Sequence, residues 1–67
     1  MNVVEGLSRE IHRVATIQQR YLELPDNAGA IAAEMMAQHL EASHVAMGNG
    51  DPLEMMRMIQ ALRDFEE

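Results

Sequence analysis

Residues 48–54, with the sequence GNGDPLE, end one predicted helix and begin the next. Gly48 can take the left-handed conformation that ends a helix, and the Asn-Gly pair after it is typical of a turn. Asp51 is a good N-cap, Pro52 suits the first helical position, and Glu54 stands at the third. This segment therefore predicts a tight connection between two helices.

A second break lies at residues 24–27, with the sequence LPDN. Pro25 disfavours helical geometry at the residue before it and cannot continue a helix through its own nitrogen. Asp26 or Asn27 can cap a new helix. The two breaks predict helices at about residues 3–23, 27–47 and 52–65. We therefore expect an all-α fold in a single helical domain, residues 1–67: an antiparallel helical hairpin and a shorter third helix, completed by oligomerisation.

Apolar residues recur at helical spacing in all three segments, which indicates that each helix has a core-facing side. In the first segment the stripe consists of Leu7, Ile11, Val14, Gln18 and Tyr21. In the second, the expected core face consists of Ile31, Ala32, Met35, Met36, Leu40 and Met47. In the third, it consists of Met55, Met58, Ile59, Leu62 and Phe65.

The small size of the chain predicts self-association. A chain of 67 residues buries a modest core, and this one has no cysteine for a disulfide or a thiolate metal site. Gly29, Ala33 and Ala37 recur every four residues, and a ridge of small side chains lets a second helix approach closely. The alternative is that the ridge reflects only the helix propensity of alanine. We predict a homo-oligomer whose interface residues are Gly29, Ala33, Ala37, Met55, Met58 and Phe65.

Charge is unevenly distributed along this acidic chain, whose net charge is −6. Residues 1–22 carry +1, residues 23–67 carry −7, and lysine is absent. Because general nucleic-acid binding requires a net basic surface, the composition argues against it.

No apolar run approaches the roughly 20 residues that span a bilayer, and the N-terminus lacks the features of a signal peptide. We expect a cytoplasmic protein with no nucleic-acid and no membrane partner.

Three arginines and a tyrosine form the candidate ligand-binding site. Arg9 and Arg13 are one helical turn apart, Arg20 lies two turns beyond Arg13, and Tyr21 follows it. Arginine is the best side chain for bidentate contacts with phosphate or carboxylate, so this stripe predicts contact with an anionic small molecule or an acidic partner. Two alternatives remain open: ordinary intrahelical ion pairs, such as Glu10 with Arg13, or contacts with the acidic second helix across a subunit interface.

No residues are spaced as an active site or a metal site. His39 and His44 are five residues apart, which places them about 140° apart around a helix rather than on one face, as helical zinc ligands require. Ser43 and His44 are sequence neighbours, and helical neighbours point to different faces. We therefore expect no enzyme activity, no catalytic residue, no metal and no cofactor.

The chain resembles the small helical accessory proteins encoded by bacteriophages, such as host-takeover factors, regulators and anti-defence proteins. The likeness lies in its compactness, acidity, helical content and C-terminal sequence, MIQALRDFEE at residues 58–67. The resemblance implies a protein that binds a host protein, or that sequesters a signalling nucleotide in an oligomer.

Three functions follow as hypotheses. The first is a small oligomeric protein-interaction module that binds and modulates another protein, in the manner of a phage-encoded inhibitor or regulator. The second is an oligomer that sequesters an anionic small molecule such as a signalling nucleotide, and the third is a structural assembly subunit. The first predicts a continuous exposed apolar patch, the second a concave pocket with several arginines, and the third neither.

Overall fold

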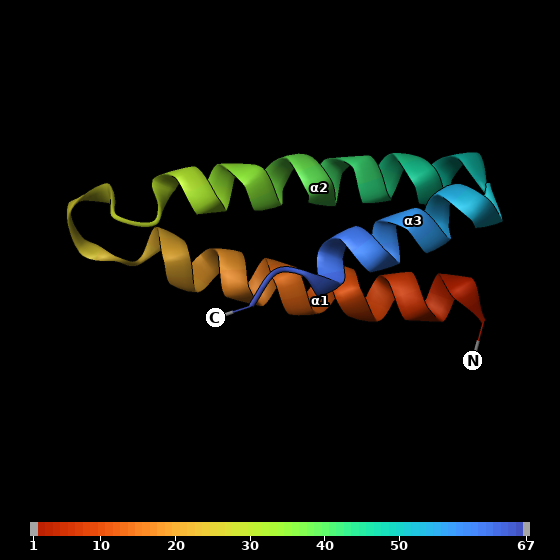
Figure 1. Ribbon diagram of the computed structural model, residues 1–67, viewed down its shortest axis with the longest axis horizontal. Coiled ribbons are helices and arrows are strands. Elements are labelled where there is room, and N and C mark those ends of the chain that lie inside the picture. The colour runs from red at the N-terminus through yellow and green to blue at the C-terminus, as the bar shows by residue number, and fades with distance from the viewer. Residues whose placement is uncertain (1, 67) are drawn as a thin grey trace.

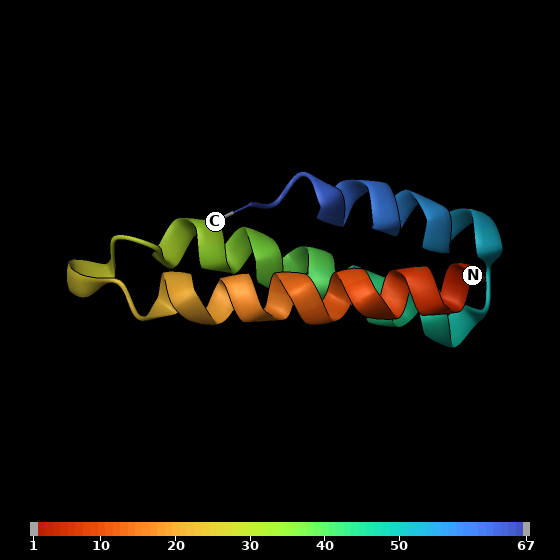
Figure 2. The same ribbon diagram turned by 90° about the horizontal axis from the view of Figure 1, so that it is seen from below.

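Three helices form the computed structural model, which describes residues 2–66. They are α1 (Val3–Leu22), α2 (Ala30–Asn49) and α3 (Pro52–Arg63), and a single turn, η1 (Pro25–Asn27), connects the first two. α1 and α2 run antiparallel as a hairpin, and α3 packs across one face of that hairpin (Figure 1, Figure 2). The predicted all-α fold of three helices is confirmed, and none of the described residues lies in a strand.

The third helix covers only part of the hairpin. α3 has 12 residues, whereas α1 and α2 have 20 each. It lies over the half that contains the start of α1 and the end of α2, and the end with η1 extends beyond it (Figure 1). The molecule is therefore elongated, with extents of 39 × 19 × 15 Å.

The core lies between the three helices and follows the predicted stripe of α1. Leu7 and Val14 are fully buried, and Ile11 and Tyr21 pack against the core from its edge. The buried apolar residues are Leu7, Val14, Ile17, Ala33, Met36, Leu40, Ala46, Met55 and Leu62. Ser43 is also fully buried, and its hydroxyl donates a hydrogen bond of 2.7 Å to the carbonyl of His39 within α2.

The start of α2 differs from the prediction. Asp26 and Asn27 each have a φ of 58°, in the left-handed region that Asp and Asn adopt more readily than most residues. They therefore form the turn, and neither of them caps α2. The helix begins at Ala30 rather than at residue 27, with Gly29 at the N-cap and no side-chain hydrogen bond there.

The connection between α2 and α3 uses a different glycine from the predicted one. Gly50, rather than Gly48, takes the left-handed conformation, with a φ of 68°. Its N–H donates to the carbonyls of Ala46 and Met47 at 3.1 and 3.2 Å, so α2 continues to Asn49. The start of α3 is as predicted, because Asp51 Oδ1 accepts from the N–H groups of residues 53 and 54 at 3.0 and 3.5 Å.

The ridge of small residues predicted at a subunit interface packs inside the chain. A Cβ atom on Gly29 would lie 2.2 Å from the carbonyl oxygen of Tyr21, so the backbones of α1 and α2 meet there. Ala33 is buried, its carbonyl accepts from Nε2 of Gln18 at 3.2 Å, and Ala37 is half-buried. The small side chains therefore serve the hairpin itself.

The three residues predicted at an interface on the third helix also contribute to the core of the chain. Met55 is buried, and Met58 and Phe65 are half-buried against the core cluster. Burial in the core is a different role from the subunit contact that was predicted for Met55. Among the large apolar residues that this fold leaves exposed, three lie along the outer side of α2: Ile31, Met35 and Val45.

Candidate functional site

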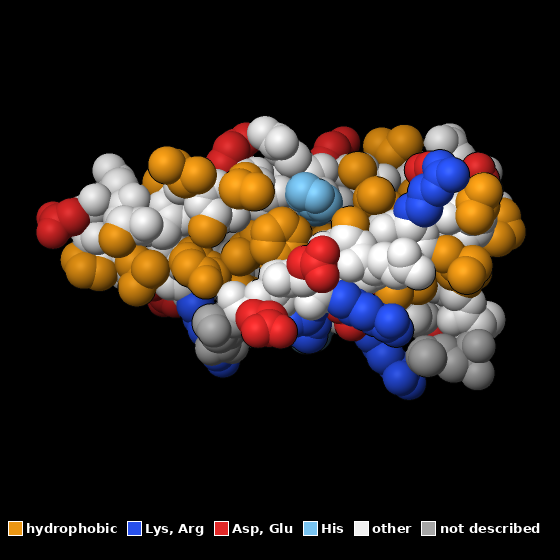
Figure 3. All heavy atoms as spheres, in the orientation of Figure 1, with side chains coloured by type: hydrophobic (Ala, Val, Ile, Leu, Met, Phe, Trp, Pro, Cys, Tyr) orange, Lys and Arg blue, Asp and Glu red, His pale blue; other side chains and the backbone are white. Residues whose placement is uncertain are grey.

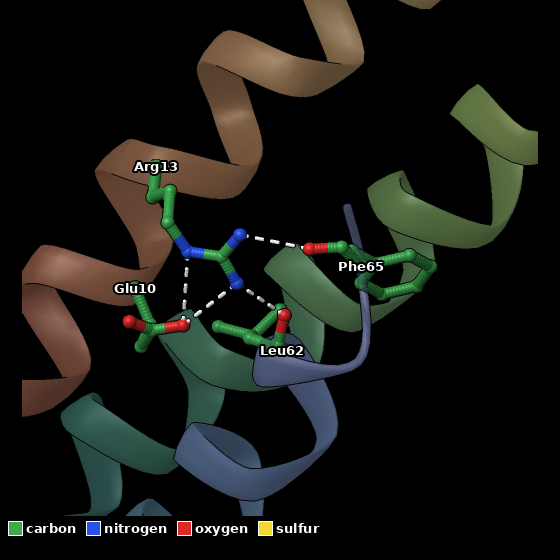
Figure 4. Close-up of polar contacts among 4 residues, drawn as sticks. All are labelled: Glu10, Arg13, Leu62 and Phe65. Atoms are coloured by element: carbon green, nitrogen blue, oxygen red, sulfur yellow. Dashed lines mark hydrogen bonds and ion pairs between the residues drawn. The ribbon is translucent and has the colours of Figure 1, made fainter. Parts of the chain in front are cut away.

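Arg13, the centre of the predicted arginine stripe, binds the end of α3. Its Nη1 donates to the carbonyl of Phe65 and its Nη2 to the carbonyl of Leu62, both at 2.8 Å (Figure 4). Nε and Nη2 also contact Oε1 of Glu10, at 3.2 and 2.9 Å. Leu62 lies in the last turn of α3 and Phe65 just beyond its end, where backbone carbonyls carry partial negative charge, so a guanidinium is well suited to them.

The segment after α3 is held by two further contacts. The Tyr21 hydroxyl donates to the carbonyl of Glu66 at 3.1 Å. The rings of His39 and Phe65 meet edge to face, with 5.2 Å between their centroids, and Nδ1 of His39 lies 2.8 Å from the carbonyl of Met35. Residues of α1 and α2 thus fix the chain beyond Arg63 against the hairpin.

The structure brings two of the four predicted ligand-binding residues into one hollow. Arg9 and Arg13 line a shallow depression of about 460 Å³ together with His12, Thr16, Ile17 and Glu66. Arg20 and Tyr21 are not among its lining residues. The carboxylate of Glu66 opposes an anion there, and most of the donors of Arg13 already bind carbonyls and Glu10. The depression is therefore only weakly suited to an anion.

The described residues show no constellation for metal binding. Among residues 2–66, no group of three or more His, Asp or Glu side chains converges where it can hold a metal ion. His44 is exposed, while the neighbouring Ser43 is buried with its hydroxyl bound to a backbone carbonyl.

None of the described helices combines the length and the apolar character needed to cross a bilayer.

The chain matches no protein-family model, no curated protein and no solved structure.

An exposed apolar stripe runs along the outer side of α2. Ile31 is 81% exposed, although it was expected in the core, and Met35 and Val45 are each about half exposed. With the exposed Gln38 and Ala42 these residues are spaced alternately by four and three, so they fall on one side of the helix. We call this set, Ile31, Met35, Gln38, Ala42 and Val45, the α2 stripe.

The α2 stripe borders a hollow at its C-terminal end. A depression of about 290 Å³ lies between α2 and α3, lined by Ala42, Val45, Ala46, Asn49, Glu54 and Met58. In Figure 3, hydrophobic side chains gather over α2, and acidic side chains stand along the outer edge of that helix. The stripe and the depression together form a surface with exposed apolar residues, bordered along one edge of α2 by acidic side chains and near α3 by the Glu54–Arg57 ion pair.

Sequence reasoning missed this surface because α2 is apolar on nearly every side. The residues predicted for its core face include Met36 and Leu40, which are buried, but also Ile31 and Met35, which are exposed. Helical periodicity locates the core only when one side of a helix is polar. The sequence does indicate that α2 has two apolar sides. The predicted contact surface is the ridge that contains Ala33, whereas the exposed apolar residues lie on the opposite side of the helix.

Proposed function

We propose that the protein is a small protein-interaction module that binds and modulates another protein through the outer side of α2. The observation that carries the proposal is the exposure of Ile31, Met35 and Val45 in one row. Single exposed apolar side chains are ordinary, but several on one side of a helix that ends at a depression are typical of an interaction site. The proposed setting is the cytoplasm, and the proposed role is that of the regulators and inhibitors among the phage accessory proteins that the chain resembles.

Site-specific photo-crosslinking in the cells that produce the protein tests this function. A photoreactive amino acid at Gln38, in the middle of the α2 stripe, should capture one defined protein. The matched position is Gln19, which is also an exposed glutamine but lies on α1. Capture at residue 38 that disappears with Ile31→Ser, and no capture at residue 19, is the expected result. Equal capture at both positions, or none at residue 38, contradicts the proposal.

A second candidate is the sequestration of an anionic small molecule in the depression at Arg9. The observation that favours it is the grouping of Arg9, His12 and Thr16 around this hollow. Native mass spectrometry of untagged protein tests it, since a retained nucleotide adds its mass to that of the chain. Arg9→Gln should remove the added mass if the ligand lies there, whereas Ile31→Ser should leave it unchanged.

A further inference from the structure

The spacing of the α2 stripe indicates the kind of structure that fits it. Its residues follow intervals of four, three, four and three, which is the pattern by which two α-helices pack along each other. From Ile31 to Val45 the stripe extends about 21 Å at 1.5 Å per residue. A partner helix of about four turns covers this length, and one large apolar side chain fits the depression beside Ala42.

The charged side chains that α2 itself places beside the stripe are acidic. Glu34 and Glu41 are both exposed and are seven residues apart, so they stand on the same flank of the stripe. Glu54 of α3 lines the depression at the end, where its carboxylate pairs with Arg57 at 2.9 Å, so it adds no uncompensated charge. α2 contains no lysine and no arginine, so no residue of this helix neutralises the flank.

A second copy of α2 fits this surface poorly. In an antiparallel pair the flank with Glu34 and Glu41 faces the same flank of the other copy, which brings like charges together. In a parallel pair it faces the flank with His39, whose ring already contacts Phe65 and the carbonyl of Met35. Positive charge on the facing flank must therefore come from a different chain.

We infer that the occupant of the α2 stripe is an amphipathic helix of another protein, with an apolar row flanked by lysine or arginine. This inference rests on the proposed function and names the class of partner. The apolar row supplies affinity, and the basic flank selects the partner through its charge complementarity with Glu34 and Glu41. The net charge of −6 also speeds the encounter with a basic segment at low salt.

Three labelled synthetic peptides serve as probes, and fluorescence anisotropy with the full chain measures their binding. The first is a helical peptide of 18 residues with leucines at the four-three spacing and lysines on both flanks. The second replaces the lysines by glutamates, and the third has the composition of the first in a scrambled order. We expect the first to bind at least tenfold more tightly than either of the others, with an affinity that falls as salt is raised.

Charge reversal on the flank gives the sharper comparison. The double variant Glu34→Lys with Glu41→Lys should bind the glutamate peptide in preference to the lysine peptide. The matched control, Glu5→Lys with Glu23→Lys, makes the same change of net charge at exposed positions on α1 and at its end, and it should keep the original preference. Ile31→Ser should lower the affinity for the lysine peptide at least tenfold. Leu53 is exposed on α3, and Leu53→Ser should leave that affinity unchanged.

Each contrary outcome overturns the inference. If the scrambled peptide binds as tightly as the lysine peptide, net charge alone drives binding. If the glutamate peptide binds as tightly as the lysine peptide, Glu34 and Glu41 do not select the partner by its charge. A dimer in light scattering that dissociates in Ile31→Ser assigns the stripe to a second copy. Crosslinking at Gln38 separates the two proposals: a captured protein together with no preference for the lysine peptide leaves the proposed function standing and removes this inference.

Discussion

At the scale of single residues, Arg13 joins two parts of the chain that lie far apart in sequence. Its guanidinium reaches Leu62 and Phe65 from the middle of α1, and Glu10 holds it in place. The end of α3 is followed by Asp64 and Glu66, whose negative charges oppose the helix dipole. The arginine offsets that unfavourable arrangement by bringing a positive charge to the last carbonyls.

Removal of Arg13 should therefore destabilise the fold. We expect Arg13→Ala to lower the free energy of unfolding by about 1.5–3 kcal/mol, because carbonyls at the end of α3 lose charged donors. The control is Arg57→Ala, since Arg57 pairs with Glu54 in an exposed salt bridge and should contribute at most about 1 kcal/mol. Urea denaturation followed by circular dichroism measures both. Equal losses in the two variants contradict a special role for Arg13.

Two glycines of this chain should respond to alanine in opposite directions. Gly29→Ala places a Cβ atom against the backbone of Tyr21, which cannot move away without opening the hairpin, so a loss of about 1–3 kcal/mol or more is expected. Gly48→Ala meets no atom within 4 Å and lies in α2, so a gain of about 0.5–1 kcal/mol is expected. Thermal unfolding of the two variants measures these changes in stability. A Gly29→Ala protein as stable as the wild type contradicts the close approach of Gly29 to the backbone of Tyr21.

At the scale of elements, the sequence was sufficient where a local signal acts alone. Asp51 and Pro52 mark the start of α3, and local capping chemistry decides this position. The start of α2 could not be predicted in the same way, because Asp26 has both the side chain of a cap and a tolerance for left-handed backbone.

The contacts of the candidate site depend on packing that no local pattern contains. The ion pair of Arg13 with Glu10 was among the alternatives that the sequence offered, but the other two partners of Arg13 are 49 and 52 residues away in sequence. Which side of α2 is buried likewise depends on where α1 and α3 lie, because α2 carries apolar side chains on more than one of its sides. Periodicity therefore predicted three helices and most of the core, but not which apolar residues remain exposed.

The cap of α3 is an element whose contribution can be measured. Asp51→Ala should lower the free energy of unfolding by about 1 kcal/mol, because the N–H groups of Leu53 and Glu54 lose their acceptor. Asp51→Asn keeps an acceptor at the same position and should lose much less. Urea denaturation of the two variants gives the comparison, and an equal loss in both indicates that charge, rather than the hydrogen bonds, stabilises the start of α3.

At the scale of the whole molecule, two apolar surfaces of different charge character remain exposed. The α2 stripe has Glu34 and Glu41 on one flank, and α2 contributes no lysine or arginine beside them. Leu53 and Met56 are exposed on α3, and Met56 lines a third depression, of about 370 Å³, between α3 and the start of α1. Both signs of charge occur around that depression, since Arg9, Glu10 and Arg63 line it. A surface with both signs can be complementary to itself, whereas the flank of α2 cannot.

We therefore expect self-association to use the groove between α1 and α3 and to leave the α2 stripe for another protein. Light scattering at tens of micromolar should report a mass above the 7.5 kDa of one chain. Met56→Glu should reduce that mass to 7.5 kDa, because it places a charge in an apolar contact, and should leave the lysine peptide bound. Ile31→Ser should have the opposite effect: the mass of the oligomer should stay the same, and binding of the lysine peptide should be lost. A folded wild-type monomer at that concentration rejects the homo-oligomer, and a mass lowered by Ile31→Ser alone places the contact between copies on α2 instead.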